Sequence, residues 1–104
     1  MADNTTNEGQ YLAVDKLIHE PARLNLMAQL FVVESADFIF LMRQTGLTQG
    51  NLSAHLSKLE TAGYLKIKKG FVGKRPQTMI SMTEKGHIAF QNYIRKMKVF
   101  FKGF

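Results

Sequence analysis

Small polar side chains are concentrated between residues 48 and 58, in a segment with the spacing of an amphipathic helix. Leu52, Leu56 and Leu59 recur at helical intervals and should face inward. The other positions offer small or hydrogen-bonding groups and no acid: Thr48, Gln49, Asn51, Ser53, Ala54, His55 and Lys58. Gln and Asn can form two hydrogen bonds with adenine, and Ser can donate or accept at a base edge. The segment therefore predicts a helix that reads the major groove of DNA, although an ordinary polar helix face capped by Thr48 explains the same residues.

Four cations lie in or next to a loop, residues 70–76, that is marked by glycine and proline. They are Lys68, Lys69, Lys74 and Arg75. Lysines at such a tip are suited to contacting phosphates, and arginine is suited to entering a narrow minor groove, so we predict that Arg75 does so. The alternative is that lysines at a sheet edge prevent strand-to-strand aggregation.

Apolar side chains recur at spacings of three and four along the last segment, at Phe90, Tyr93, Ile94, Met97, Phe100 and Phe101. A small domain cannot readily bury all of them, so we predict a dimer interface shared with the first helix through Leu12. One alternative is packing onto the domain's own core. Another is a membrane-surface helix, because cations flank the apolar face at Arg95, Lys96, Lys98 and Lys102.

The distribution of charge indicates a polyanionic partner. The chain has 104 residues and a formal net charge of +6. Residues 1–57 hold three basic residues against six acidic ones, whereas residues 58–104 hold eleven against two. Such asymmetry favours DNA, RNA or an anionic membrane as the partner, and a solvated, solubilising surface is the alternative. An RNA stacking platform fits less well, because the exposed strand positions carry lysine more than aromatic residues.

Nothing in the sequence is typical of an enzyme or a metal site. There is no cysteine, and His19, His55 and His87 are dispersed without carboxylates at ligand spacing. We find no nucleophile–base pair, phosphate-binding glycine loop or carboxylate pair, so we expect neither catalysis nor a cofactor. The longest apolar stretches are too short to span a bilayer, and residues 1–10 lack the apolar segment of a secretion signal. A cytoplasmic location is therefore expected, with no membrane partner.

Helical periodicity places the first elements. Residues 1–10 are predicted to be a disordered tail, and residues 11–104 a single domain. A first helix is expected over Tyr11–His19, and Pro21 should end it and open a second helix that runs to about Val33. Ser35 is the expected N-cap of a third helix. Gly46 should end it, and Thr48 should cap the fourth, the reading helix over about residues 48–62.

After Gly63 the period changes from helix to strand. Residues 64–69 and 77–82 alternate between apolar and polar, which predicts an antiparallel hairpin around the loop of residues 70–76, with Pro76 at the end of the pairing. Thr83 should cap a last helix, the dimerisation helix over about residues 83–101. The order of elements predicts a mainly α fold with a small β-hairpin, an α+β winged helix-turn-helix.

Several of these stretches resemble compact winged-helix DNA-binding regulators related to the MarR and ArsR families. The resemblance lies in residues 17–24, 46–60, 62–64, 73–78 and 82–86, and spans about residues 14–97 in all. It implies a homodimer that binds a palindromic operator through two recognition helices and two wings. On this chain it assigns base reading to Thr48, Gln49, Asn51, Ser53, Ala54, His55 and Lys58, and the wing to Lys74, Arg75 and Thr78.

We therefore predict a sequence-specific regulator of transcription that binds double-stranded DNA as a homodimer, acting as a repressor by blocking polymerase, although activation is equally compatible. The chain departs from ArsR-type metal sensors because it lacks cysteine or clustered histidine ligands. Full MarR proteins are longer, with extra helices that frame a ligand pocket, so no effector is predicted here. The alternatives are a winged-helix protein–protein interaction module and a non-specific nucleic-acid binder.

Overall fold

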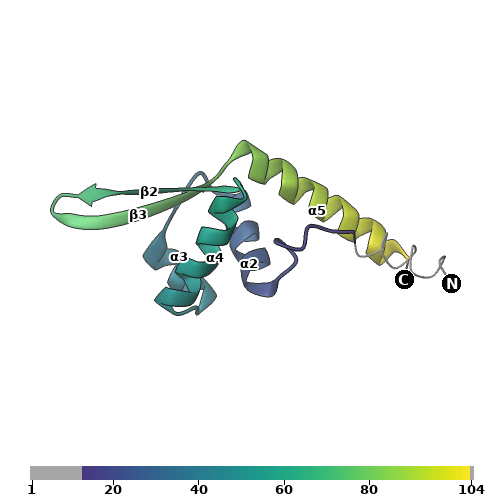
Figure 1. The fold of residues 1–104 in the computed structure, drawn as a ribbon, viewed down its shortest axis with the longest axis horizontal. Helices are drawn as coiled ribbons and strands as arrows, with labels where there is room; N and C mark the ends of the chain where they lie inside the picture. Colours follow the sequence, from purple (N-terminus) through teal and green to yellow (C-terminus); the bar gives the residue numbers. More distant parts are fainter. Residues whose placement is uncertain (1–12, 104) are drawn as a thin grey trace.

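The computed structural model describes residues 13–103, which form one elongated body (Figure 1). Its helices are α2 (Pro21–Phe31), α3 (Phe38–Thr45), α4 (Gln49–Thr61) and α5 (Glu84–Lys102). Its strands are β1 (Ala36–Asp37), β2 (Leu65–Val72) and β3 (Arg75–Met82), which form an antiparallel sheet in the order β1-β3-β2. The predicted mainly α fold with a β-hairpin is confirmed. The predicted tail of residues 1–10 and the interface residue Leu12 lie outside the described residues.

The chain just before α2 forms a hydrogen-bonded turn, so the helix predicted over Tyr11–His19 is wrong for the described part of that range. The Asp15 carboxylate accepts hydrogen bonds from the N–H groups of Leu17 and Ile18, at 2.9 and 3.2 Å. An aspartate that captures nearby backbone donors in this way competes with a continuing helix. Ile18 is fully buried, so the turn is anchored in the core.

Pro21 opens α2 as the sequence predicts, and Glu20 is the N-cap. Glu20 is extended, with φ −124° and ψ 132°, and its side chain accepts from the N–H of Arg23 at 2.9 Å. Pro21 takes the first helical position, where its missing N–H leaves no hydrogen bond unmade. The helix ends at Phe31, two residues earlier than predicted, and Val33 is exposed. Its buried side chains make it the central core helix: Leu26, Met27 and Leu30.

A short strand that the sequence did not predict, β1, precedes α3. Ala36 pairs with Ile80 and Asp37 with Met79 of β3. The N-cap of α3 is consequently Asp37 and not the predicted Ser35, since the Asp37 carboxylate accepts from the N–H of Ile39 at 2.8 Å. The pairing joins residues far apart in the sequence, and a local pattern cannot record it.

A tight turn joins α3 to α4, as predicted. Gly46 adopts the left-handed conformation, with φ 72°, and its N–H donates to the carbonyl of Met42. Thr48 then caps α4, because its Oγ1 accepts from the N–H of Asn51 at 3.2 Å. The inward face of α4 carries the three predicted leucines, all buried: Leu52, Leu56 and Leu59.

The hairpin is longer, and its turn tighter, than predicted. β2 and β3 stay in register out to the pair Val72–Arg75, so only Gly73 and Lys74 form the turn. Gly73 has a φ of 64°, and a two-residue turn that leads with such a glycine has the pattern of type II′. The residues predicted as a loop, 70–76, are therefore mostly strand.

Pro76 lies inside β3, opposite Phe71, and does not mark the end of pairing as predicted. A proline lacks the N–H that a central strand would need. Here it is tolerated because β1 pairs with β3 only at Met79 and Ile80, which leaves the outer part of β3 with β2 as its single neighbour.

The start of α5 is fixed to the junction of α4 and β2. The Oγ1 of Thr83 accepts from the N–H of Gly86 at 3.0 Å and donates to the carbonyl of Gly63 at 2.5 Å. Gly86 is packed so closely that a Cβ there would lie 2.2 Å from the carbonyl oxygen of Tyr64. From this point α5 and the hairpin extend in opposite directions from the body (Figure 1).

Candidate nucleic-acid interface

The outer face of α4 has the surface predicted for a reading helix. Six of the seven predicted residues are exposed there: Thr48, Gln49, Asn51, Ser53, Ala54 and Lys58. The first turn carries no acidic side chain, so its backbone N–H groups and the positive end of the helix dipole face outward unopposed. This face can donate and accept hydrogen bonds without bulky groups that would keep it from a groove floor.

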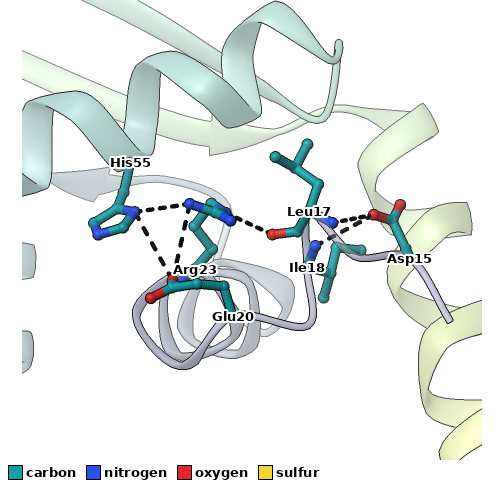
Figure 2. A network of polar contacts seen from close by, with 6 residues as sticks. All are labelled: Asp15, Leu17, Ile18, Glu20, Arg23 and His55. Atoms are coloured by element: carbon teal, nitrogen blue, oxygen red, sulfur yellow. Dashed lines mark hydrogen bonds and ion pairs between the residues drawn. The ribbon is translucent and has the colours of Figure 1, made fainter. Parts of the chain in front are cut away.

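His55 is the exception, because its side chain is directed at the start of α2 (Figure 2). Its Nδ1 lies 3.1 Å from a guanidinium nitrogen of Arg23 and 3.8 Å from a carboxylate oxygen of Glu20. The Nε of the same guanidinium donates to the carbonyl of Leu17 at 2.6 Å. These contacts tie α4 to the N-terminal turn and direct His55 away from the six exposed residues, and its base contact stays a prediction.

Glu20 is held in its charged form by this arrangement. Its carboxylate accepts from the N–H of Arg23, and that hydrogen bond is the main cause of its lowered pKa. Partial burial opposes the shift, and the nearby charges of His55 and Arg23 add to it. The start of α2 therefore keeps a negative charge opposite His55 and Arg23.

The hairpin distributes its cations over both faces and the tip. Side chains alternate along a strand, so Lys69 shares the α4-facing side with Ile67, while Lys68 lies on the other side. Arg75 pairs with Val72, so it lies on the same side of the hairpin as Lys68, and Lys74 occupies the turn itself. All four cations are exposed. A hairpin with this distribution can contact phosphates along most of its outer length.

A groove of about 650 Å³ lies between α4 and the hairpin. Gln49, Ser53 and Glu60 line it from α4, and Lys69 and Thr78 line it from the sheet. Lys69 and Thr78 are cross-strand partners, which places the predicted wing residue Thr78 beside a cation. The structure thus brings Gln49 and Ser53 of the helix face to one groove with Lys69 and Thr78 of the hairpin. Lys68, Lys74 and Arg75 are not among the residues that line it.

Comparison with known proteins agrees with this geometry. Residues 22–101 match the protein family described as winged helix DNA-binding domain. The chain belongs to this family. An uncharacterized protein of Methanocaldococcus jannaschii is 39% identical over 79 residues, which cover 76% of this chain and 86% of the relative.

Solved structures place the winged-helix chain among transcription regulators. A transcriptional regulator homologue from Pyrococcus horikoshii superposes with a TM-score of 0.80 at 28% identity, over 86% of this chain and 88% of that one. A protein of Enterococcus faecalis described as a transcriptional regulator of the MarR family superposes with a TM-score of 0.66 at 24% identity, over 85% and 76% of the two chains, and shows the shared fold. The family and the fold support a DNA-binding regulator, and this family implies a binding protein rather than an enzyme.

In this winged-helix protein, two of the predicted dimer-interface residues are used internally. Phe90 and Tyr93 are each only 5% exposed and belong to the core. Phe90 packs edge-on against Phe31, with their ring centroids 5.1 Å apart. Their prediction as interface residues is corrected, because α5 spends its first half covering α2. Ile94 and Met97 are half-buried. The rings of Phe100 and Phe101 pack against each other near the end of the helix, with their centroids 5.4 Å apart.

Sequence reasoning missed two features around the wing. Asp15 accepts a hydrogen bond from the hydroxyl of Tyr64, which joins the N-terminal turn to the base of β2. Burial, followed by this hydrogen bond and the charge of Asp15, raises the pKa of Tyr64 to about 12. The second feature is a group of exposed apolar side chains at the wing tip. In the sequence, Lys68, Lys69 and Gly70 separate Phe71 and Val72 from Ile67. This interruption of the apolar–polar alternation marks Phe71 and Val72 as residues that do not face the core.

Two further properties bear on the range of functions. Within residues 13–103, no three histidine, aspartate or glutamate side chains come together as metal ligands would. In the same part of the chain, no helix combines the length and the apolar character that crossing a bilayer requires.

Proposed function

We propose that the protein binds specific double-stranded DNA sequences as a homodimer and regulates transcription. One observation carries this proposal: Gln49 and Ser53 of the exposed polar face of α4 line the same groove as Lys69 and Thr78 of the wing. Such a surface matches the alternation of bases and phosphates in a duplex, where α4 would enter the major groove and the wing would follow the adjacent backbone.

In the proposed complex the first turns of α4 read the bases. Gln49, Asn51 and Ser53 are exposed near the N-terminal end of the helix, and Ala54 gives a small apolar surface suited to a thymine methyl group. Lys58 lies farther along the helix and reaches a phosphate. The first-turn N–H groups, with Thr48 as their cap, supply a second phosphate contact.

The wing supplies the part of the affinity that is independent of sequence. Lys68, Lys69, Lys74 and Arg75 would neutralise phosphates, and Thr78 would add a hydrogen bond where the backbone passes the groove. If the two protomers neutralise about eight phosphates, the logarithm of affinity should fall with the logarithm of salt concentration with a slope near −7.

The outer half of α5 is the proposed dimer contact. Ile94 and Met97 are half-buried against the core, and Phe100 and Phe101 continue the same apolar stripe toward the end of the helix. Two chains joined there would place their α4 helices on one side of the duplex, about 34 Å apart, for a palindromic operator. Repression is the proposed mode, because occlusion of polymerase requires no surface beyond those already described.

Selection of bound duplexes from a random pool tests this proposal. We expect one palindromic sequence to be enriched, and we expect it to outcompete scrambled duplex in gel shifts at all salt concentrations between about 50 and 200 mM. Equal competition by scrambled duplex would show non-specific binding and reject the operator. Absence of any salt-dependent binding would reject the DNA-binding role and favour an apolar protein partner.

A further inference from the structure

Three apolar side chains are exposed at the outer end of the wing: Phe71, Val72 and Pro76, the apolar tip. Phe71 is 73% exposed and Val72 is 59% exposed. Leaving an aromatic side chain of this size in water forgoes about 2 kcal/mol of burial. The tip is also surrounded by Lys68, Lys69, Lys74 and Arg75, so the apolar atoms do not belong to a larger apolar patch.

The strand register places Phe71 one step beyond the groove. Phe71 pairs with Pro76, and the next pair on the same face, toward the body, is Lys69 with Thr78. Lys69 and Thr78 line the groove next to Gln49 and Ser53. Two residues of strand span roughly 7 Å, so Phe71 lies about that far outward from the level of Lys69.

We propose that Phe71 is a wedge that enters the minor groove and partly unstacks one base step beside the sequence read by α4. This inference rests on the proposed function. When α4 occupies the major groove, the neighbouring phosphate backbone crosses the level of Lys69 and Thr78. The phenyl ring, one pair farther out, then lies past that backbone over the minor groove. Pro76 supports it from the opposite strand as a rigid partner.

Charge favours DNA over a second copy of the chain as the occupant. Two identical tips, each with four cations, would repel each other, since the acidic side chain that lines the adjoining groove, Glu60, belongs to α4 and not to the tip. A duplex offers phosphates for those cations and an apolar stack of bases for the ring. Apolar wedges that enter from the minor groove act in this way and kink the duplex toward the major groove.

The wedge predicts a preference at base pairs that no polar side chain contacts. Pyrimidine–purine steps such as TA and CA are the easiest to unstack, so they should be enriched at one fixed position flanking each half-site. Arg75, on the opposite face of the wing, would act separately as a phosphate contact.

Fluorescence of 2-aminopurine placed at successive flanking positions of the selected operator tests the wedge. Wild-type protein should raise the emission at one position, because the base there is unstacked. Phe71→Ala should abolish that rise and weaken operator binding by about tenfold, the scale of one base–aromatic stacking contact. Phe71→Leu should restore part of the rise. Val72→Ala is the matched control, since it shortens an exposed apolar side chain on the other face.

Each outcome separates the wedge from the proposed function. Salt-steep, sequence-specific binding without a rise in emission would overturn the wedge and leave the proposed function standing. No DNA binding by the wild-type protein would overturn both. An unchanged rise in Phe71→Ala would show that another group unstacks the base and would overturn the wedge. A change in oligomeric state by sedimentation with unchanged DNA binding would assign the apolar tip to protein contact and also overturn the wedge. Because Phe71 is exposed, thermal unfolding should match wild type and show that the variant folds.

Discussion

The wing and the outer half of α5 both present apolar side chains among lysines, but they differ in how these side chains relate to the core. In α5 the apolar stripe is continuous: it starts at buried Phe90, passes half-buried Ile94 and Met97, and reaches exposed Phe101. In the wing, Phe71 is separated from buried Ile80 by the level of Lys69 and Thr78. A stripe that extends the core suits a protein partner, whereas an apolar tip isolated among cations suits a polyanion.

The cations of the two regions also differ in whether the chain itself uses them. Lys96 of α5 donates to the carbonyl of Ala13 at 2.9 Å, so one of the α5 cations is used within the chain. The four wing cations extend beyond the body with no acidic residue between Thr61 and Thr83. We therefore propose that the same residue types serve different partners according to their position on the fold.

The largest effect should come from charging the α5 stripe. Met97→Asp should convert the dimer to a monomer in sedimentation, because a carboxylate cannot be buried there without a partner. Operator affinity should fall by about 10² to 10³, the loss expected when two linked half-sites become independent, while affinity for a single half-site stays unchanged. Gln91→Asp, which adds the same charge at an exposed position of α5, is the control. If Met97→Asp remained a dimer in sedimentation, the α5 stripe would not be the dimer contact, and the proposed contrast between α5 and the wing would fail.

Removing charge from the wing should have an intermediate effect. Lys74→Ala combined with Arg75→Ala should weaken binding to operator and scrambled duplex alike by about tenfold, and flatten the salt slope by about one per lost phosphate contact. The dimer should be unaffected. Lys98→Ala, which removes a cation from α5, should leave the slope close to that of wild type. If Lys98→Ala flattened the slope as much as the wing variant does, the two regions would not differ in role.

The smallest effect concerns the body that joins the two regions. The pKa of Tyr64 is raised from 10.0 to about 12. Its folded pKa exceeds the unfolded one, so the neutral phenol contributes stability that is complete below pH 10 and disappears as the pH rises toward 12. Tyr64→Phe should lower the free energy of unfolding by about 1 kcal/mol at pH 8 through loss of the hydrogen bond to Asp15.

Denaturant unfolding at several pH values measures this. The difference between wild type and Tyr64→Phe should shrink between pH 10 and 12. A difference that stays constant over that range would mean that the phenol and Asp15 do not interact as the structure shows.

The elements that could be predicted from sequence are those whose hydrogen bonds close within a few residues. Gly46 after α3, Thr48 before α4 and Thr83 before α5 each bond to backbone groups three or four residues away, and Pro21 at the start of α2 needs no hydrogen bond from its own nitrogen. Burial along α4 was predictable for the same reason, because helical period alone sets which leucines face inward. The exposed reading face follows directly from that period.

What the sequence could not show depends on contacts between distant segments. β1 exists because Ala36 meets Ile80, and His55 faces inward because Arg23 happens to lie beside it. Local sequence predicts Pro76 as a loop residue, yet pairing with β2 keeps it in a strand. Phe71 belongs to the same predicted loop, and only the cross-strand register shows on which face of the wing it lies.

The most direct test of the account is the base preference of Asn51→Ala on the selected operator, measured at several salt concentrations beside the wing variant. We predict that Asn51→Ala loses discrimination at one base pair by about 1 to 3 kcal/mol while its salt slope stays that of wild type. The wing variant should show the reverse, with a flatter slope and unchanged discrimination. If both variants weaken binding equally on every sequence, then α4 does not read bases and the central claim is contradicted.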